Sequence, residues 1–246
     1  MKFSVGLLSW RRVGNIRYIV DEYMLYDDLI DEIIIWNNNP DEHIDFVGEH
    51  YKDLVKVINV QSKEDFGLIT RFNMGSLSKN KMILLHDDDL CFPEESLIKL
   101  RDEWEKENNC FHTFFGRNPK PDGTYSQKVV EGKAEICGRC YVIDRELCGL
   151  ILTEYWRLNE EERKLIHSKG DDILASYVLT HYTGNLHSVH DIPYEQLDES
   201  YALSFGASRP LRPTTEQHQQ EIREWYSYRT EMMQFCKKRY QHGYEG

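Results

Sequence analysis

The sequence has little of the residues that mark extended or disordered chains, with 7 Pro and 15 Gly among 246 residues. That content excludes a collagen-like or low-complexity chain. No apolar run approaches the roughly 20 residues that a helix needs to cross a bilayer. Residues 1–8 carry one charged side chain and no small-residue cleavage site, which makes them a poor signal peptide. We therefore expect a cytoplasmic protein without a transmembrane segment.

Positive charge is also scarce, because 30 Lys and Arg stand against 42 Asp and Glu, for a formal net charge of -12. This balance disfavours a protein that grips nucleic acid through a broad basic surface. The six cysteines follow no disulfide framework, so we expect free thiols. Cys137-Gly138-Arg139-Cys140 is a lone CxxC without a second pair at zinc spacing, and it does not predict a structural zinc.

Three common active-site motifs are missing from the chain: Gly-x-Gly-x-x-Gly, the Walker Gly-Lys-Ser/Thr and the nucleophile elbow Gly-x-Ser-x-Gly. What is present in the first half is an alternation of strand and helix patterns. Strands are predicted at 3–9, 31–36, 54–60 and 81–86, and helices at 14–26, 67–78 and 94–107. This order predicts an α/β fold, with a Rossmann-like, mostly parallel central sheet and flanking helices.

The second half has shorter strand patterns and ends in a long helix pattern. Strands are predicted at 111–116, 124–130 and 136–143, and helices at 144–152, 171–180 and 214–241. The last of these has an apolar stripe that includes Ile222, Tyr226, Met233 and Tyr240, which predicts packing onto the α/β body. No linker rich in Pro, Gly or Ser interrupts the chain, so we expect a single domain over residues 1–246.

Polar clusters follow three of the predicted strands: Arg11-Arg12, Asn37-Asn38-Asn39 and Asp87-Asp88-Asp89. In an open α/β sheet, ligands bind outside the carboxyl ends of the strands. One polar cluster after a strand is ordinary loop chemistry. Three clusters with cationic, amide and carboxylate groups predict one composite site.

Asp87-Asp88-Asp89, the Asp triplet, predicts a divalent cation. Two carboxylates about 4 Å apart repel by roughly 4 kcal/mol at an effective dielectric constant near 20. A divalent cation removes that penalty and can bridge to phosphate oxygens. Strand alternation places Asp87 and Asp89 on one side if the extended geometry continues. The alternative is a solvated acidic turn ahead of the helix that begins near Pro93.

Three further candidates have ordinary structural explanations beside the functional ones. Asn37 and Asn38 are typical turn residues before a proline, or their amides pair with a nucleobase edge. For Arg71, one alternative is a surface arginine whose aliphatic stem is buried, and the other is an arginine that belongs to the site.

Asp171-Asp172 opens a helix pattern, where acidic residues stabilise the N-terminus. The functional alternative is a catalytic carboxylate pair. Local pattern alone favours the capping role.

Taken together, Ser9-Trp10-Arg11-Arg12, the strand end Trp36-Asn37-Asn38, the Asp triplet and Gly170-Asp171-Asp172 resemble GT-A glycosyltransferases. The order is most similar to the exostosin-type N-acetylhexosaminyltransferase domain of glycosyltransferase family 64, over residues 3–180 or so. The resemblance implies a GT-A-like fold with a nucleotide-sugar-binding half (1–110), an acceptor and catalytic half (111–213) and a C-terminal helix (214–246).

The resemblance also implies a nucleotide-diphosphate sugar donor, expected to be a UDP-sugar, with Mn²⁺ or Mg²⁺. It implies that Arg12, Asn37 or Asn38, and Arg71 help to hold the donor. Asp87 and Asp88 would contact uridine and ribose, and Asp89, with Asp87, would bind the metal. Asp172, beside Asp171, matches the second carboxylate of the family's catalytic pair, and transfer would retain the anomeric configuration.

The chain departs from that family in several places. Leu8 replaces the polar residue that often precedes the first motif, and the segment around Arg71 matches loosely. Beyond Asp172 the match fades, so Arg209, with Arg212 as the alternative, is the expected late basic residue of the donor site. The acceptor does not transfer from the family: a glycan, a glycoconjugate or another hydroxyl-bearing molecule fits, and a modified nucleic-acid base is not excluded.

Three other functions stay open at this point. An inverting GT-A enzyme would use the same donor site. A sugar-nucleotide nucleotidyltransferase has a similar sheet and a carboxylate-bound metal, but normally a Gly-rich loop after the first strand, which residues 8–14 lack. A non-catalytic nucleotide-sugar binder would need no carboxylate like Asp172 facing the sugar.

Overall fold

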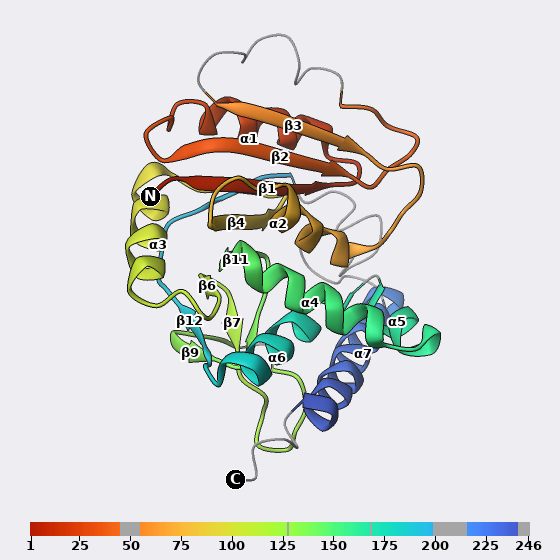
Figure 1. Cartoon of the computed structure of the whole chain (residues 1–246). Coiled ribbons are helices and arrows are strands. Elements are labelled where there is room, and N and C mark those ends of the chain that lie inside the picture. The colour runs from red at the N-terminus through yellow and green to blue at the C-terminus, as the bar shows by residue number, and fades with distance from the viewer. Residues whose placement is uncertain (45–54, 127, 168, 199–215, 241–246) are drawn as a thin grey trace.

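The computed structural model describes residues 1–44, 55–126, 128–167, 169–198 and 216–240. The chain folds around one large sheet, with helices on both of its faces (Figure 1). The sheet has eight strands in the order β3-β2-β1-β4-β11-β6-β12-β9. Its parallel half consists of β1 (Phe3–Ser9), β2 (Ile30–Asn37), β3 (Lys56–Gln61) and β4 (Met82–Asp87). This half confirms the parallel α/β arrangement that the sequence predicts.

The other half of the sheet is mixed, because β11 runs antiparallel to β4. Its strands are short: β6 (His112–Thr113), β9 (Gly132–Ala134), β11 (Cys140–Asp144) and β12 (His187–Val189). Smaller pairings are made by β5 (Leu90–Cys91) with β13 (Glu195–Gln196), and by β7 (Gly116–Arg117) with β8 (Val129–Val130) and β10 (Ile136–Cys137).

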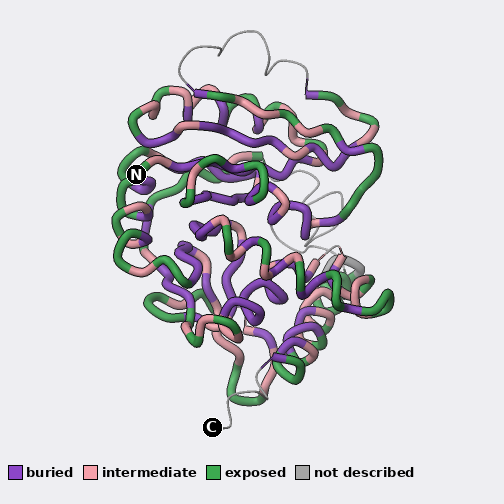
Figure 2. The backbone as a smooth tube through the Cα atoms, viewed as in Figure 1, coloured by how far each residue is buried: buried purple, intermediate pink, exposed green. Residues whose placement is uncertain are grey.

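Side-chain alternation along the strands builds a hydrophobic core on each face of the sheet. In β2, Ile33 and Ile35 join one core and Ile34 joins the other, as in a strand that is buried on both faces. One core packs against α1 (Val13–Tyr23) and α3 (Glu94–Lys106), and the other against α4 (Arg145–Arg157) and α6 (Asp171–Thr183). Figure 2 shows the buried backbone running through the strands between these helices.

Several predicted elements differ from the structure. The predicted helix over 67–78 is a 3₁₀ helix, η2 (Leu68–Asn73), followed by the single-turn α2 (Met74–Leu77). The predicted strand over 124–130 is wrong for most of its length, because only Val129–Val130 pairs with a neighbour among the described residues. Residues 111–116 fall into two short strands of different sheets. Helix α5 (Glu160–His167) has one buried side chain, so it leaves little apolar periodicity to find.

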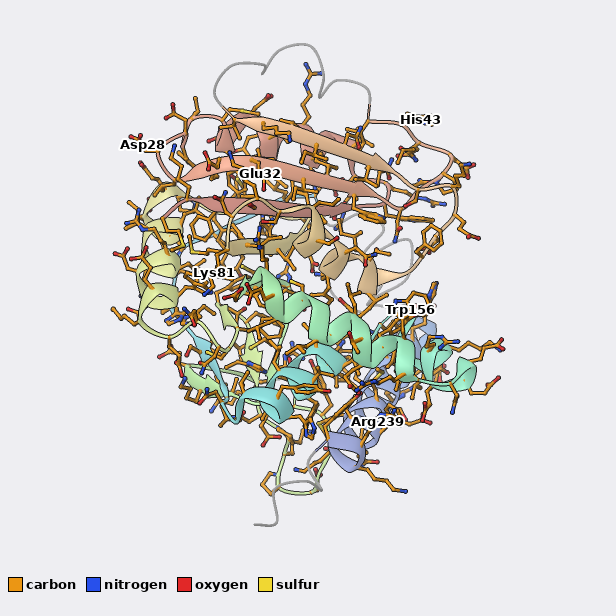
Figure 3. All side chains as sticks on the ribbon, viewed as in Figure 1. Asp28, Glu32, His43, Lys81, Trp156 and Arg239 are labelled. Carbon is orange, nitrogen blue, oxygen red and sulfur yellow. The ribbon has the colours of Figure 1, made fainter. Side chains whose placement is uncertain are left out.

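The C-terminal helix α7 (Glu216–Tyr240) packs onto the body as the apolar stripe predicts. Met232, Met233, Cys236 and Tyr240 are buried. Gly170, directly before α6, permits this contact, because a Cβ on Gly170 would lie 2.2 Å from Met232. By contrast, Trp156 on α4 projects outward with 67% of its surface exposed (Figure 3).

All six cysteines are free and buried, which confirms the expectation of thiols. Within the described ranges, no helix is both long and apolar enough to cross a membrane.

Candidate functional site

Members of all three predicted clusters line one cavity of about 530 Å³ at the carboxyl ends of the parallel strands. The loop after β1 contributes Arg11 and Arg12, β4 and its following turn contribute the Asp triplet, and α6 begins beside them with Asp171 and Asp172. The far wall comes from the 115–125 segment and from α7. Local sequence places each group on a different element, and the parallel sheet brings them together.

Arg12 holds the second and third members of the Asp triplet. Its guanidinium contacts Asp88, and its Nη1 donates to Asp89 Oδ2 at 2.8 Å. The other oxygen of Asp89 accepts from Arg139 Nη2 at 3.1 Å. Asp88 and Asp89 are both nearly inaccessible, at 3% and 6% exposed, so these arginines supply the charge that a buried carboxylate requires.

Arg71 joins the first member of the triplet to the start of α6. Its Nη1 lies 2.9 Å from Asp87 Oδ1, and its Nε lies 2.9 Å from Asp171 Oδ2. The residue is 5% exposed, and its guanidinium carbon lies 5.8 Å from the centre of the Tyr141 ring. The sequence could not separate a surface arginine from a site residue at position 71, and the structure places it between two acidic groups of the cavity.

Arg229 of α7 binds Asp172. Its Nη1 lies 3.1 Å from Asp172 Oδ1, and its Nη2 contacts Oδ2. The guanidinium also donates to the hydroxyl of Tyr125 at 2.9 Å and lies 4.6 Å from the centre of that ring. Gly170 is the N-cap residue of α6, and Asp171 and Asp172 lie in its first turn, where Asp172 Oδ1 also accepts from Ile173 N at 2.9 Å. The helix-start role that local pattern favours is therefore present together with the contact to Arg229.

The two asparagines have different positions. Asn38 lines the cavity, and its Nδ2 donates to Gly67 O at 2.9 Å and to Asp65 Oδ1 at 3.2 Å. Asn37 is not among the lining residues, and its Nδ2 donates to Glu42 O and Gln61 Oε1. Asn37 therefore braces the loop after β2, while Asn38 borders the space itself.

Burial and close charges shift the acidity of these carboxyl groups. Burial raises the pKa of Asp88 to about 7 against the attraction of Arg12, and burial also raises the pKa of Asp171 to about 6. Burial and the charge of Asp87 raise the pKa of Asp89. For Asp87, the attraction of Arg71 and Arg139 outweighs burial and lowers the pKa. A cluster in which the pKa values of neighbouring carboxyl groups are shifted in opposite directions is typical of a functional site.

The donor set fits a hard divalent cation. Mn²⁺ and Mg²⁺ prefer carboxylate oxygens, and like charge from Asp87 already acts on Asp89. Arg71 contacts the Oδ1 atom of Asp87, and the Asp87 side chain lines the cavity with 28% of its surface exposed, so a cation can reach it. Asp89 would have to exchange an arginine contact for the ion. The residues present therefore fit a metal held by Asp87 and Asp89.

A second acidic and thiol cluster, Glu107, Cys110 and His112, has ligand atoms within 4.8 Å of one another. Its groups are satisfied without an ion. Lys133 Nζ lies 2.7 Å from Glu107 Oε2, and His112 Nε2 lies 2.5 Å from the Glu107 carbonyl oxygen, to which it donates. Since that nitrogen carries the proton, it cannot also offer a lone pair to a metal.

Sequence reasoning missed Arg139, Arg229 and an aromatic wall formed by Phe115, Tyr125, Trp225 and Tyr226. One signal for Arg229 was available: it lies seven residues from both Ile222 and Cys236, on the apolar stripe of α7. A cation on such a stripe needs a buried partner. The expected late basic residue, Arg209, and its alternative, Arg212, lie outside the described residues.

Comparisons with known proteins support the fold. No protein-family model matches the sequence, and no curated protein matches it. Among solved structures, the chain is similar to S. aureus TarS, a glycosyltransferase, with a TM-score of 0.52 and 14% sequence identity. The match covers 83% of this chain and 38% of the TarS chain. The chain thus has a glycosyltransferase-like fold and spans less than half of TarS, and the comparison does not identify the exostosin-type family.

Proposed function

We propose that the protein is a metal-dependent glycosyltransferase that moves a sugar from a nucleotide-diphosphate donor, expected to be a UDP-sugar, to a hydroxyl-bearing acceptor. One observation carries the proposal: a single cavity gathers Arg12, Arg71, the Asp triplet and Asp172 in a fold similar to that of a glycosyltransferase. The aromatic wall on the far side offers flat apolar surfaces against which sugar rings can pack.

The donor would lie over the carboxyl ends of β1, β2 and β4. Asn38 borders that part of the cavity with an amide, and Asp87 and Asp88 offer carboxylates to uridine and ribose hydroxyls. Arg12 and Arg71 lie beside the same carboxylates and would balance the charge of the diphosphate. Asn37 would act indirectly, by bracing the loop that carries Asn38.

Asp89 and Asp87 would hold Mn²⁺ or Mg²⁺. When bound, the cation supplies a Lewis acid that neutralises the diphosphate and stabilises it as a leaving group. Arg12 contacts both Asp88 and Asp89, and Arg139 contacts Asp89, so the two arginines offset the repulsion between these buried carboxylates.

Asp172 would stabilise the positive charge that develops on the sugar as the glycosidic bond breaks. The bidentate contact with Arg229 fixes the carboxylate in place and occupies both of its oxygens. While that contact lasts, neither oxygen is free to take a proton from an acceptor hydroxyl, and the carboxylate keeps a fixed position beside the sugar. This favours transfer with retention over an inverting enzyme that uses Asp172 as its general base. Asp171 would position Arg71.

The test is a panel of nucleotide sugars and nucleoside triphosphates, measured by thermal shift with Mn²⁺ and with EDTA. A specific donor at 100 times its dissociation constant should add about 2.7 kcal/mol of stability. Stabilisation by a nucleotide sugar with Mn²⁺, followed by slow hydrolysis of that sugar, supports the proposal. Selective stabilisation by a nucleoside triphosphate would support a nucleotidyltransferase instead, and binding without any turnover would support a non-catalytic binder.

A further inference from the structure

Arg139 occupies a strained turn at the edge of the cavity. It has φ of 62°, and no other non-glycine residue in the described part of the chain has a positive φ. Cys140 N donates to Gly138 O across it at 2.7 Å. A hydrogen bond between residues two apart, around a positive φ, defines the rare form of γ-turn, which is strained for any residue with a Cβ. Glycine would adopt this turn at lower cost.

The strained turn positions both the backbone and the side chain of Arg139 against the Asp triplet. The Arg139 carbonyl accepts from Asp87 N at 2.9 Å, and Nη2 donates to Asp89 Oδ1 at 3.1 Å and to Gln196 Oε1 at 2.8 Å. A glycine would keep the backbone hydrogen bond and lose only the guanidinium. The backbone therefore does not explain an arginine at this position.

The guanidinium itself lines the cavity, 5.9 Å from the Phe115 ring, and its side chain is 22% exposed. Asp89 has a second arginine, Arg12, at the shorter distance of 2.8 Å, so Arg139 is not its only counter-charge. Arg139 thus has a strained backbone and a side chain that reaches the cavity. Its partner, Asp89, already has a counter-charge in Arg12. Strain kept at a binding site is a sign of function.

We propose that Arg139 is a ligand-binding residue whose guanidinium contacts the phosphates of the bound diphosphate. The inference rests on the proposed function for the site and adds a residue to it. A cation held by Asp89 would compete with Arg139 for that carboxylate. The Arg139 guanidinium would then donate to the diphosphate oxygens, which are the acceptors that a planar, permanently charged group prefers.

The test uses inorganic pyrophosphate as the probe, with Mg²⁺ and with EDTA, in calorimetric titrations of the full chain. Arg139→Gly should weaken pyrophosphate binding at least tenfold with Mg²⁺ and less with EDTA, while the melting temperature stays the same or rises. Arg139→Lys, which keeps a positive charge, should lose less affinity than Arg139→Gly. Arg101→Gln, which removes an arginine that pairs with Asp102 on the surface of α3, is the matched control and should change nothing.

Unchanged pyrophosphate affinity in Arg139→Gly would overturn the proposal, and so would a large fall in its melting temperature, which would mark the arginine as structural. The outcome is separable from the proposed function by a parallel titration with UDP. If the parent protein binds pyrophosphate through Arg139 but binds no nucleotide diphosphate, the proposed function fails and the assignment of Arg139 stands.

Discussion

Arg229 and Asp172 lie 57 residues apart in the sequence and form a two-point contact in the lining of the cavity. Arg229 comes from α7 and Asp172 from the first turn of α6, so the C-terminal helix completes the site as well as covering the core. The arginine is 5% exposed and packed over two rings, 4.6 Å from Tyr125 and 4.9 Å from Trp225.

Removal of this arginine should affect both stability and turnover. Arg229→Gln leaves a largely buried carboxylate without its cation, which typically costs about 3–5 kcal/mol. Chemical denaturation should show that loss, and the double variant Arg229→Gln/Asp172→Asn should lose less stability than the sum of the two single variants. Arg239→Gln on the exposed face of α7 is the control and should cost at most about 1 kcal/mol. If the double variant loses as much stability as the two single variants together, Arg229 and Asp172 do not interact.

Donor binding should depend on the metal through Asp89. In the parent protein, UDP should bind at least about tenfold more tightly with Mn²⁺ than with EDTA, a difference of about 1.4 kcal/mol. Asp89→Ala should abolish that dependence, because Asp87 alone offers too few oxygens. Asp102→Ala, an exposed aspartate of α3, serves as the control. Equal UDP affinity with Mn²⁺, with EDTA and in Asp89→Ala, measured by calorimetry, would show that the metal assignment is wrong.

Acid should unfold the protein partly through buried histidines. His187 Nε2 donates to Ser176 O at 3.0 Å and Nδ1 accepts from Phe111 N at 3.3 Å, so the environment fits only the neutral ring. Burial lowers the pKa of His187 to about 4, below its unfolded value of about 6.5. The stability that this histidine contributes is therefore complete above pH 6.5 and is lost as the pH falls towards 4.

His187→Gln removes that ionisation. Between pH 6 and 4.5, the dependence of unfolding free energy on pH should become shallower by up to about 1.4 kcal/mol per pH unit, the value for one proton. Urea denaturation at several pH values measures it, and the exposed His43→Gln is the control. If the pH dependence of the unfolding free energy is the same in His187→Gln, His187 does not take up a proton on unfolding as proposed.

The contact between Gly170 and α7 should be sensitive to a single methyl group. A Cβ at Gly170 would meet Met232 at 2.2 Å, and Met232 is fully buried, so its side chain has little room to move. Gly170→Ala should cost about 1–3 kcal/mol by overpacking, and Met232→Ala in the same chain should recover part of it. Gly149→Ala in α4, where a Cβ meets nothing within 4 Å, should be neutral or stabilising. Equal effects of the two alanines would argue against close packing here.

Periodicity predicted the parallel half of the sheet because each of its strands carries its own apolar pattern, as in Ile33-Ile34-Ile35. The short strands of the second half, such as Gly116–Arg117, are stabilised by neighbours distant in sequence and have no pattern of their own. The same distinction holds in the site. The Asp triplet was visible as a local cluster, whereas the roles of Arg139 and Arg229 depend on contacts 50 and 57 residues away.

The structure also separates residues that the sequence treated alike. Asn37 and Asn38 are adjacent, yet one braces a loop and the other borders the cavity, because neighbouring residues at a strand end point in opposite directions. Asp171 and Asp172 divide in the same way between Arg71 and Arg229. Two identical residues in a row can therefore indicate where a site lies, but not which contact each of them makes.

The most direct test of the central claim is Asp172→Asn in a donor-hydrolysis or transfer assay, with UDP binding and the product anomer measured on the same samples. Because Asp172 would stabilise the charge on the sugar, turnover should fall at least about a hundredfold, roughly 2.7 kcal/mol of barrier, while UDP binding is kept. The parent protein should give a product with the anomeric configuration of the donor. Asp102→Asn should behave like the parent. Near-normal turnover in Asp172→Asn would contradict the catalytic role, and an inverted product from the parent would contradict retention.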